Sequence, residues 1–265
     1  MDLFLGVVHN NNPERMTSLR ETIKTVSSRL DEVGYCVKYG EASYQAGLHG
    51  RQRIEDIWRR VVYDFVVDQG RKVQEKNTKF PRLLLRILIG FVLWVKRSRR
   101  DERLAIQIAI TAKHLHLIET ALNGGARLAI ILEDDAVLHK DSSEILSTRV
   151  LPLLEQLKTR TKWFVNLAGD SLETLIPGLT HLSKNFSEGV LEVVPAQVDT
   201  VCAYALDRDA MDALMKSIVL SPNLRNANMD HLLNRELPRM GAKAYHLVPG
   251  ALGHGSNVAM FSTWR

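Results

Sequence analysis

The chain has 265 residues, and 45% of them are hydrophobic, which is enough to bury the core of one large α/β domain and excludes a disordered protein. Lys and Arg number 35 against 30 Asp and Glu, which gives a net charge of +5. The basic excess is concentrated between residues 51 and 103. We therefore expect one local surface that faces anionic lipid, phosphate or nucleic acid.

The first predicted elements are a strand at 3–8, a polar turn at 9–13 and a helix at 13–33. Pro13 suits the first turn of a helix, and Gly34 suits its end. Because ligands of open α/β sheets bind at the carboxyl ends of strands, this unit is typical of a nucleotide-binding turn. No GxGxxG motif is present, so a dinucleotide site has little support.

The sequence has two cysteines, Cys36 and Cys202, and each lies in an apolar, strand-like stretch. We expect both thiols to be buried, which fits a reducing cytoplasm better than an oxidising compartment. Neither a CxxC motif nor a Cys/His cluster with zinc-site spacing occurs.

Residues 51–103 form the most unusual segment. An amphipathic helix is predicted at 51–69, and an apolar run follows at 83–95, interrupted by Arg86. A helix that spans a bilayer needs roughly 20 residues, so this run is too short. Trp94 and the basic residues at 96–100 are typical of a helix that lies in the headgroup region of an anionic membrane. A buried core helix with an exposed basic end is the alternative.

A long helix is predicted at 101–122, and Asn123-Gly124-Gly125 ends it. His114 lies on this helix and is expected to be packed or hydrogen-bonded. The chain then enters an apolar strand at 128–132 that is followed by three consecutive acids, Glu133, Asp134 and Asp135.

Three neighbouring carboxylates at the end of a buried strand repel one another and resist desolvation, so a cation is a common reason for such a cluster. Along a strand, Glu133 and Asp135 would share one face. Ligand sets made of oxygen alone favour hard ions such as Mg²⁺ or Mn²⁺. A solvated acidic turn is the alternative interpretation.

The Leu-Glu-Asp-Asp-x-x-Leu stretch at 132–138, preceded by a long helix and a Gly-rich turn, resembles glycosyltransferase family 25, the lipooligosaccharide-type sugar transferases. The resemblance covers about 3–39 and 104–256. It implies an α/β protein with a GT-A fold: one nucleotide-binding domain at 1–265 with a mostly parallel central sheet, into which 51–103 is inserted. The composition of that helical insertion is the reason to expect contact with the membrane surface.

The resemblance also implies an activity. Such an enzyme is a hexosyltransferase that moves galactose or another hexose from a nucleotide-diphosphate sugar, with UDP the expected nucleotide, to a glycan or lipid-linked acceptor with inversion. It would act in lipopolysaccharide biosynthesis. The two cysteines and the basic, apolar insertion at 51–103 add the expectation of a cytoplasmic protein, peripheral on the inner face of the membrane.

The same resemblance assigns roles to residues. The donor nucleotide would contact Asn11, Arg15, Glu133 and Asp134; the cation, Mn²⁺ or Mg²⁺, would bind Asp135, Glu133 and His254; and Asp230 would be the catalytic base. Simpler structural roles remain open for four of them: a helix cap for Asn11 and for Asp230, a helix-surface position for Arg15, and a solvent-exposed loop position for His254.

Two other function classes remain open. A metal-dependent phosphohydrolase also uses acids at strand ends, and a non-catalytic membrane-surface binding protein would use the 51–103 segment without the acids. Nucleic-acid binding is disfavoured because the positive charge is local and aromatic residues do not interleave with the basic ones.

Overall fold

The computed structural model describes residues 2–43, 98–168, 183–198 and 201–255. Its first half contains β1 (Asp2–His9), α1 (Pro13–Glu32), β2 (Cys36–Ser43), α4 (Ser98–Asn123), β3 (Leu128–Glu133), β4 (Ala136–Val137), α5 (Ser142–Ile145), a π-helical turn (Leu146–Val150) and α6 (Leu151–Leu157). Its second half contains β5 (Trp163–Asn166), β6 (Ser183–Ser187), β7 (Val190–Val193), β8 (Ala203–Asp207), α8 (Arg208–Leu220), a 3₁₀ helix (Pro222–Asn226), α9 (Met229–Arg239), β9 (Lys243–Leu247) and β10 (Gly253–His254).

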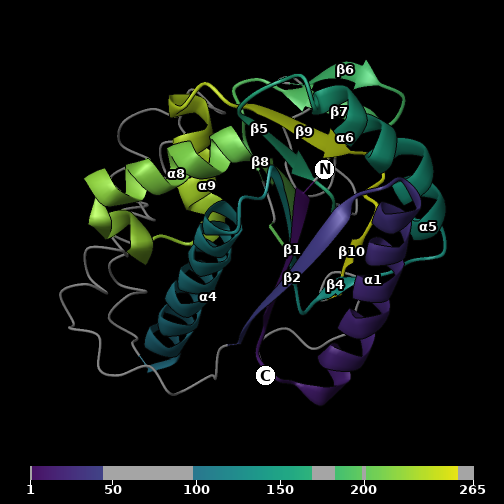
Figure 1. The fold of residues 1–265 in the computed structure, drawn as a ribbon. Helices are drawn as coiled ribbons and strands as arrows, with labels where there is room; N and C mark the ends of the chain where they lie inside the picture. The colour runs from purple at the N-terminus through teal and green to yellow at the C-terminus, as the bar shows by residue number, and fades with distance from the viewer. Residues whose placement is uncertain (1, 44–97, 169–182, 199–200, 256–265) are drawn as a thin grey trace, which may run out of the picture.

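Eight strands form the central sheet, in the order β2-β1-β3-β8-β5-β9-β7-β6 (Figure 1). β1 pairs in parallel with β2 and β3, and β5 pairs in parallel with β9. β8 runs antiparallel to both β3 and β5, and β7 runs antiparallel to both β6 and β9. In the described residues six strands therefore point one way and two point the other. The sequence-based expectation of an α/β fold is confirmed, with a sheet that is mixed.

Helices cover both faces of this sheet. α1, α5 and α6 lie on one side, and α4, α8 and α9 lie on the other (Figure 1). The alternation of side chains along β3 serves both layers, because Leu128, Ile130 and Leu132 join the core under α1 while Ala129 and Ile131 join the core under α4. The predicted strand that is buried on both faces is confirmed.

Local sequence signals determine where α1 begins and where α4 ends. The Asn12 side chain caps α1 by accepting hydrogen bonds from the backbone N–H groups of Glu14 and Arg15. At the end of α4, Gly125 has a φ of +77°, a conformation that suits glycine. Both predicted helices are found at these places, at Pro13–Glu32 and Ser98–Asn123.

The structure tests the expected burial of the two cysteines but not the expected membrane-contacting segment. Cys202 is buried as expected, whereas Cys36 is exposed on β2, the outermost strand of the described sheet next to β1, so the expectation of two buried thiols is wrong for Cys36. One buried thiol, that of Cys202, therefore remains in favour of a reducing compartment. The predicted helix at 51–69 and the apolar run at 83–95 lie outside the described residues. Among the described helices, none has the length and apolar character needed to cross a bilayer.

Candidate functional site at the carboxyl edge of the sheet

Several polar residues meet where β1 and β3 end and β8 begins. The parallel register places Val8 opposite Glu133, so both strands end at the same edge. Because β8 is antiparallel, its N-terminal approach reaches this edge, and the backbone N–H of Glu133 donates to the carbonyl of Cys202 at 2.7 Å. The sheet therefore brings together the acidic segment Glu133–Asp135, the turn after β1 and the start of β8.

Asp134 joins the acidic segment to the start of α1. One carboxylate oxygen accepts from the backbone N–H of Asn10 at 3.0 Å, and the other accepts from Nη1 of Arg15 at 2.9 Å. The side chains of Asp134 and Arg15 are 5% and 15% exposed, so this ion pair is mostly desolvated. Arg15 is therefore not the helix-surface residue that one interpretation predicted.

Asn11 lies in the same turn but has a different environment. It is exposed, has a φ of +61°, and its backbone N–H donates to Nδ1 of His9 at 3.3 Å. The helix cap is Asn12, so the predicted cap role of Asn11 is wrong. The predicted contacts of Asn11, Arg15 and Asp134 with a nucleotide-sugar substrate stay predictions.

Asp135 and His254 are brought together by a small ribbon in which β10 pairs antiparallel with β4. His254 lies opposite Ala136, and the backbone N–H of Gly255 donates to the carbonyl of Asp135 at 2.7 Å. Nε2 of His254 then lies 3.4 Å from Oδ2 of Asp135. The side chain of His254 is 21% exposed, so it is not a loop histidine free in solvent.

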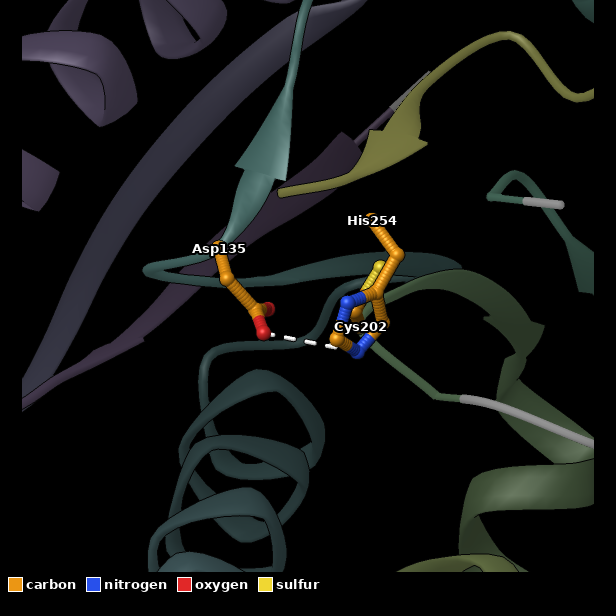
Figure 2. A group of neighbouring side chains, drawn as sticks. All are labelled: Asp135, Cys202 and His254. Atoms are coloured by element: carbon orange, nitrogen blue, oxygen red, sulfur yellow. Dashed lines mark ion pairs between the residues drawn. The ribbon is translucent and has the colours of Figure 1, made fainter. Parts of the chain in front are cut away.

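Cys202 completes this group, and sequence reasoning missed it. One possible ligand atom from each of Asp135, Cys202 and His254 lies within 4.8 Å of the other two (Figure 2). Glu133, which was predicted as a metal ligand, is not a member of this group. Its charge is still close enough to raise the pKa of Asp135, which burial and this repulsion bring to about 6.

Glu133 instead faces a buried histidine. Its Oε1 lies 2.9 Å from Nε2 of His114, and Nδ1 of His114 lies 2.9 Å from the Tyr204 hydroxyl. The expectation that His114 is hydrogen-bonded is confirmed. Burial lowers the pKa of His114 to about 4, so its ring is neutral at pH 7. With Glu133 ionised, Nε2–H donates to the carboxylate and the Tyr204 hydroxyl donates to Nδ1.

Burial, followed by the charge of Asp134, raises the pKa of Glu133 to about 7, while His254 and Arg15 act in the opposite direction. The raised pKa values of Glu133 and Asp135 share two physical causes, burial first and then repulsion between neighbouring carboxylates, which His254 and Arg15 only partly offset. A bound divalent cation would favour the ionised form of both acids.

Asp230 belongs to the same electrostatic environment. It lies in the first turn of α9, where Asn228 holds the cap position, so the alternative of Asp230 as the helix cap is wrong. The negative charge of Asp230 acts to raise the pKa values of both His114 and Tyr204. The predicted base is therefore within electrostatic reach of His114 and Tyr204.

Comparisons with known proteins identify no family. No family model matches the chain, and no curated protein matches it. Among solved structures, one that matches is a glycosyltransferase involved in the glycosylation of the major capsid of PBCV-1, with 9% sequence identity and a TM-score of 0.31. The match covers 83% of this chain and 65% of that one. The resemblance to family 25 therefore stays an expectation from the sequence.

Proposed function

We propose that this protein is a metal-dependent glycosyltransferase that moves a hexose from a nucleotide-diphosphate sugar to a glycan or lipid-linked acceptor. The proposal is supported chiefly by the contact of Asp135 with His254 and the ion pair of Asp134 with Arg15 at one edge of the sheet, together with Asp230, whose charge reaches His114. In open α/β sheets this edge is where ligands bind. Sugar transfer from a diphosphate needs a cation site, a fixed positive charge and a carboxylate that accepts a proton from the acceptor.

The side chains of Asp135 and His254 are suitable ligands for a divalent cation. Oδ1 of Asp135 and Nδ1 of His254 are both buried and have no hydrogen-bond partner, so a cation bound there would satisfy polar atoms that are otherwise unpaired. Mn²⁺ or Mg²⁺ bound by these residues would neutralise the charge that builds on the departing diphosphate. We assign Asp135 and His254 as its ligands, with Glu133 beside them.

Arg15 and Asp134 position the donor in this proposal. Their ion pair fixes the acidic turn against the start of α1, where the N-terminal backbone N–H groups favour negative charge. Asn11, exposed in the same turn, contributes a side chain to the donor nucleotide, for which we propose UDP. Asp134 acts through Arg15 and Asn10 because both of its oxygens accept hydrogen bonds from them.

Asp230 takes the proton from the acceptor hydroxyl, whose oxygen then attacks the anomeric carbon as the bond to the diphosphate breaks. A single displacement of this kind inverts the anomeric centre. A positioned general base contributes about 10²- to 10⁴-fold to the rate. The acceptor would be presented at the inner face of the membrane, to which the basic segment at 51–103 would bind.

The test is a nucleotide-release assay. The protein is incubated with UDP-hexoses, Mn²⁺ or Mg²⁺ and a glycan acceptor, and released UDP is measured separately from inorganic phosphate. Release of UDP supports sugar transfer, whereas release of phosphate alone supports the phosphohydrolase and release of neither leaves no support for an enzyme.

One substitution tests the base. Asp230→Asn is expected to lower turnover by at least about 100-fold while the affinity for the UDP-sugar stays unchanged. Asp209→Asn is a matched control, because Asp209 also lies in the first turn of a helix, α8, but is exposed. Equal turnover of the two variants would show that another group holds the role of base.

A further inference from the structure

Three donor atoms of different chemistry meet at the edge of the sheet. Asp135 follows β3, Cys202 precedes β8 and His254 lies on β10, so three separate segments each supply one side chain (Figure 2). One oxygen, one sulfur and one nitrogen lie within 4.8 Å of one another. In a tetrahedral zinc site with bonds of about 2.0–2.3 Å, donor atoms lie roughly 3.5 Å apart, so small side-chain rotations would close this group around an ion.

The group is built into the protein and does not lie on its surface. Cys202 is 1% exposed and Asp135 is 6% exposed. Oδ1 of Asp135 and Nδ1 of His254 are buried without a hydrogen-bond partner. A buried polar atom that lacks a partner destabilises the folded state, so two such atoms in one group of metal-ligating side chains point to a ligand that both would bind.

The sulfur decides which class of ion fits. Mg²⁺ takes oxygen ligands and requires near-octahedral geometry, so a thiolate is a poor partner for it. Zn²⁺ and Co²⁺ accept sulfur, imidazole nitrogen and carboxylate oxygen together. Three protein ligands also leave a fourth position open, which is the arrangement of catalytic zinc sites.

We propose that Asp135, Cys202 and His254 form a divalent-metal centre with a thiolate ligand, which prefers Co²⁺ or Zn²⁺ to Mg²⁺. The inference deepens the proposed function, because it concerns the cation of the same site, but its test does not depend on sugar transfer. When the ion binds, the Cys202 thiol releases its proton to solvent and the sulfur donates an electron pair to the metal.

Cobalt spectroscopy tests the proposal directly. Protein freed of any histidine tag and of bound metal is titrated with Co²⁺, and the thiolate-to-cobalt charge-transfer band in the near ultraviolet is recorded. The sequence has two cysteines, so in Cys36→Ser protein a thiolate band can come from Cys202 alone. We expect that variant to keep the full band, with one Co²⁺ bound per chain, and a large excess of Mg²⁺ to leave the band unchanged.

Two further variants complete the experiment. Cys202→Ser is expected to remove the band and His254→Gln to weaken Co²⁺ binding by at least about 10-fold, with circular dichroism as a check that each variant folds. Absence of the band in Cys36→Ser protein, or its displacement by Mg²⁺, would overturn the proposal. A strong band in a protein that releases no UDP would refute the proposed function alone, whereas UDP release with Mg²⁺ and no band would refute this inference alone.

Discussion

Arg15→Met is expected to destabilise the protein because it leaves a buried carboxylate without its cation. Asp134 and Arg15 are 5% and 15% exposed, and their closest charged atoms lie 2.9 Å apart. Removing one partner of a buried ion pair costs about 3–5 kcal/mol, most of which is the penalty for burying the remaining charge. Because the backbone N–H of Asn10 still donates to Asp134 in the variant, we expect about 3 kcal/mol, the lower end of that range.

Urea unfolding at pH 7 measures this cost, and a second substitution shows its origin. Asp134→Asn removes the charge, so the double variant Arg15→Met/Asp134→Asn is expected to lose clearly less stability than the sum of the two single variants. Lys216→Met is the control, since Lys216 and Asp212 form an ion pair whose side chains are 72% and 51% exposed. Exposed pairs contribute between zero and about 1 kcal/mol. A cost for Arg15→Met no larger than that for Lys216→Met, or strict additivity in the cycle, would refute the reasoning.

Two further predictions concern buried histidines. Tyr204→Phe leaves Nδ1 of His114 without its hydrogen-bond partner and is expected to lower the free energy of unfolding in urea by about 1–3 kcal/mol. The control is Tyr39→Phe, at an exposed tyrosine, which is expected to cost under about 0.5 kcal/mol. Equal costs for the two variants would contradict the buried contact. Burial lowers the pKa of His246 from 6.5 to about 4, so between these pH values the unfolded chain binds a proton that the folded chain does not, and stability falls as the pH is lowered through this window. The full contribution of His246 to this loss of stability is roughly 3 kcal/mol. When unfolding is measured at pH 7 and pH 4.5, His246→Gln is expected to lose less stability at the lower pH than the parent protein does. Identical losses would contradict the lowered pKa of His246.

The sequence predicts the individual elements well because their signals are local. The apolar runs at 3–8 and 128–132 correspond to β1 and β3, and α1 begins at Pro13 and ends two residues before Gly34, close to the predicted length. His114 also carries a local signal, since it lies four residues from both Ile110 and Ile118 on the buried side of α4. A polar residue in such a stripe needs a partner, although the sequence does not say which one.

The partners depend on how the sheet is assembled, and that information is not local. Asp135 meets His254 only because β10 pairs with β4, and Cys202 reaches the same place because β8 enters antiparallel between β3 and β5. The exposure of Cys36 has the same origin, because its apolar surroundings in the sequence do not reveal that β2 is the outermost described strand on that side. Motif reading therefore finds the acids but not the sulfur beside them.

The three consecutive acids have three different partners, and this division determines the charge of the site. Strand alternation predicts that Glu133 and Asp135 share one face, but β3 ends at Glu133, after which the chain turns. Glu133 faces His114, Asp134 pairs with Arg15, and Asp135 pairs with His254.

In the proposed metal centre, this division would leave Asp135 as the one carboxylate of the three that binds the ion directly. If Cys202 binds as a thiolate, its charge and that of Asp135 together balance a divalent ion, whereas His254 contributes none. A second directly bound carboxylate would leave the buried centre with excess negative charge, which is costly in a poorly solvated site. If the proposed ion binds, the hydrogen bond between Glu133 and His114 would therefore matter to the metal as well as to the fold, since it gives that carboxylate a partner other than the ion.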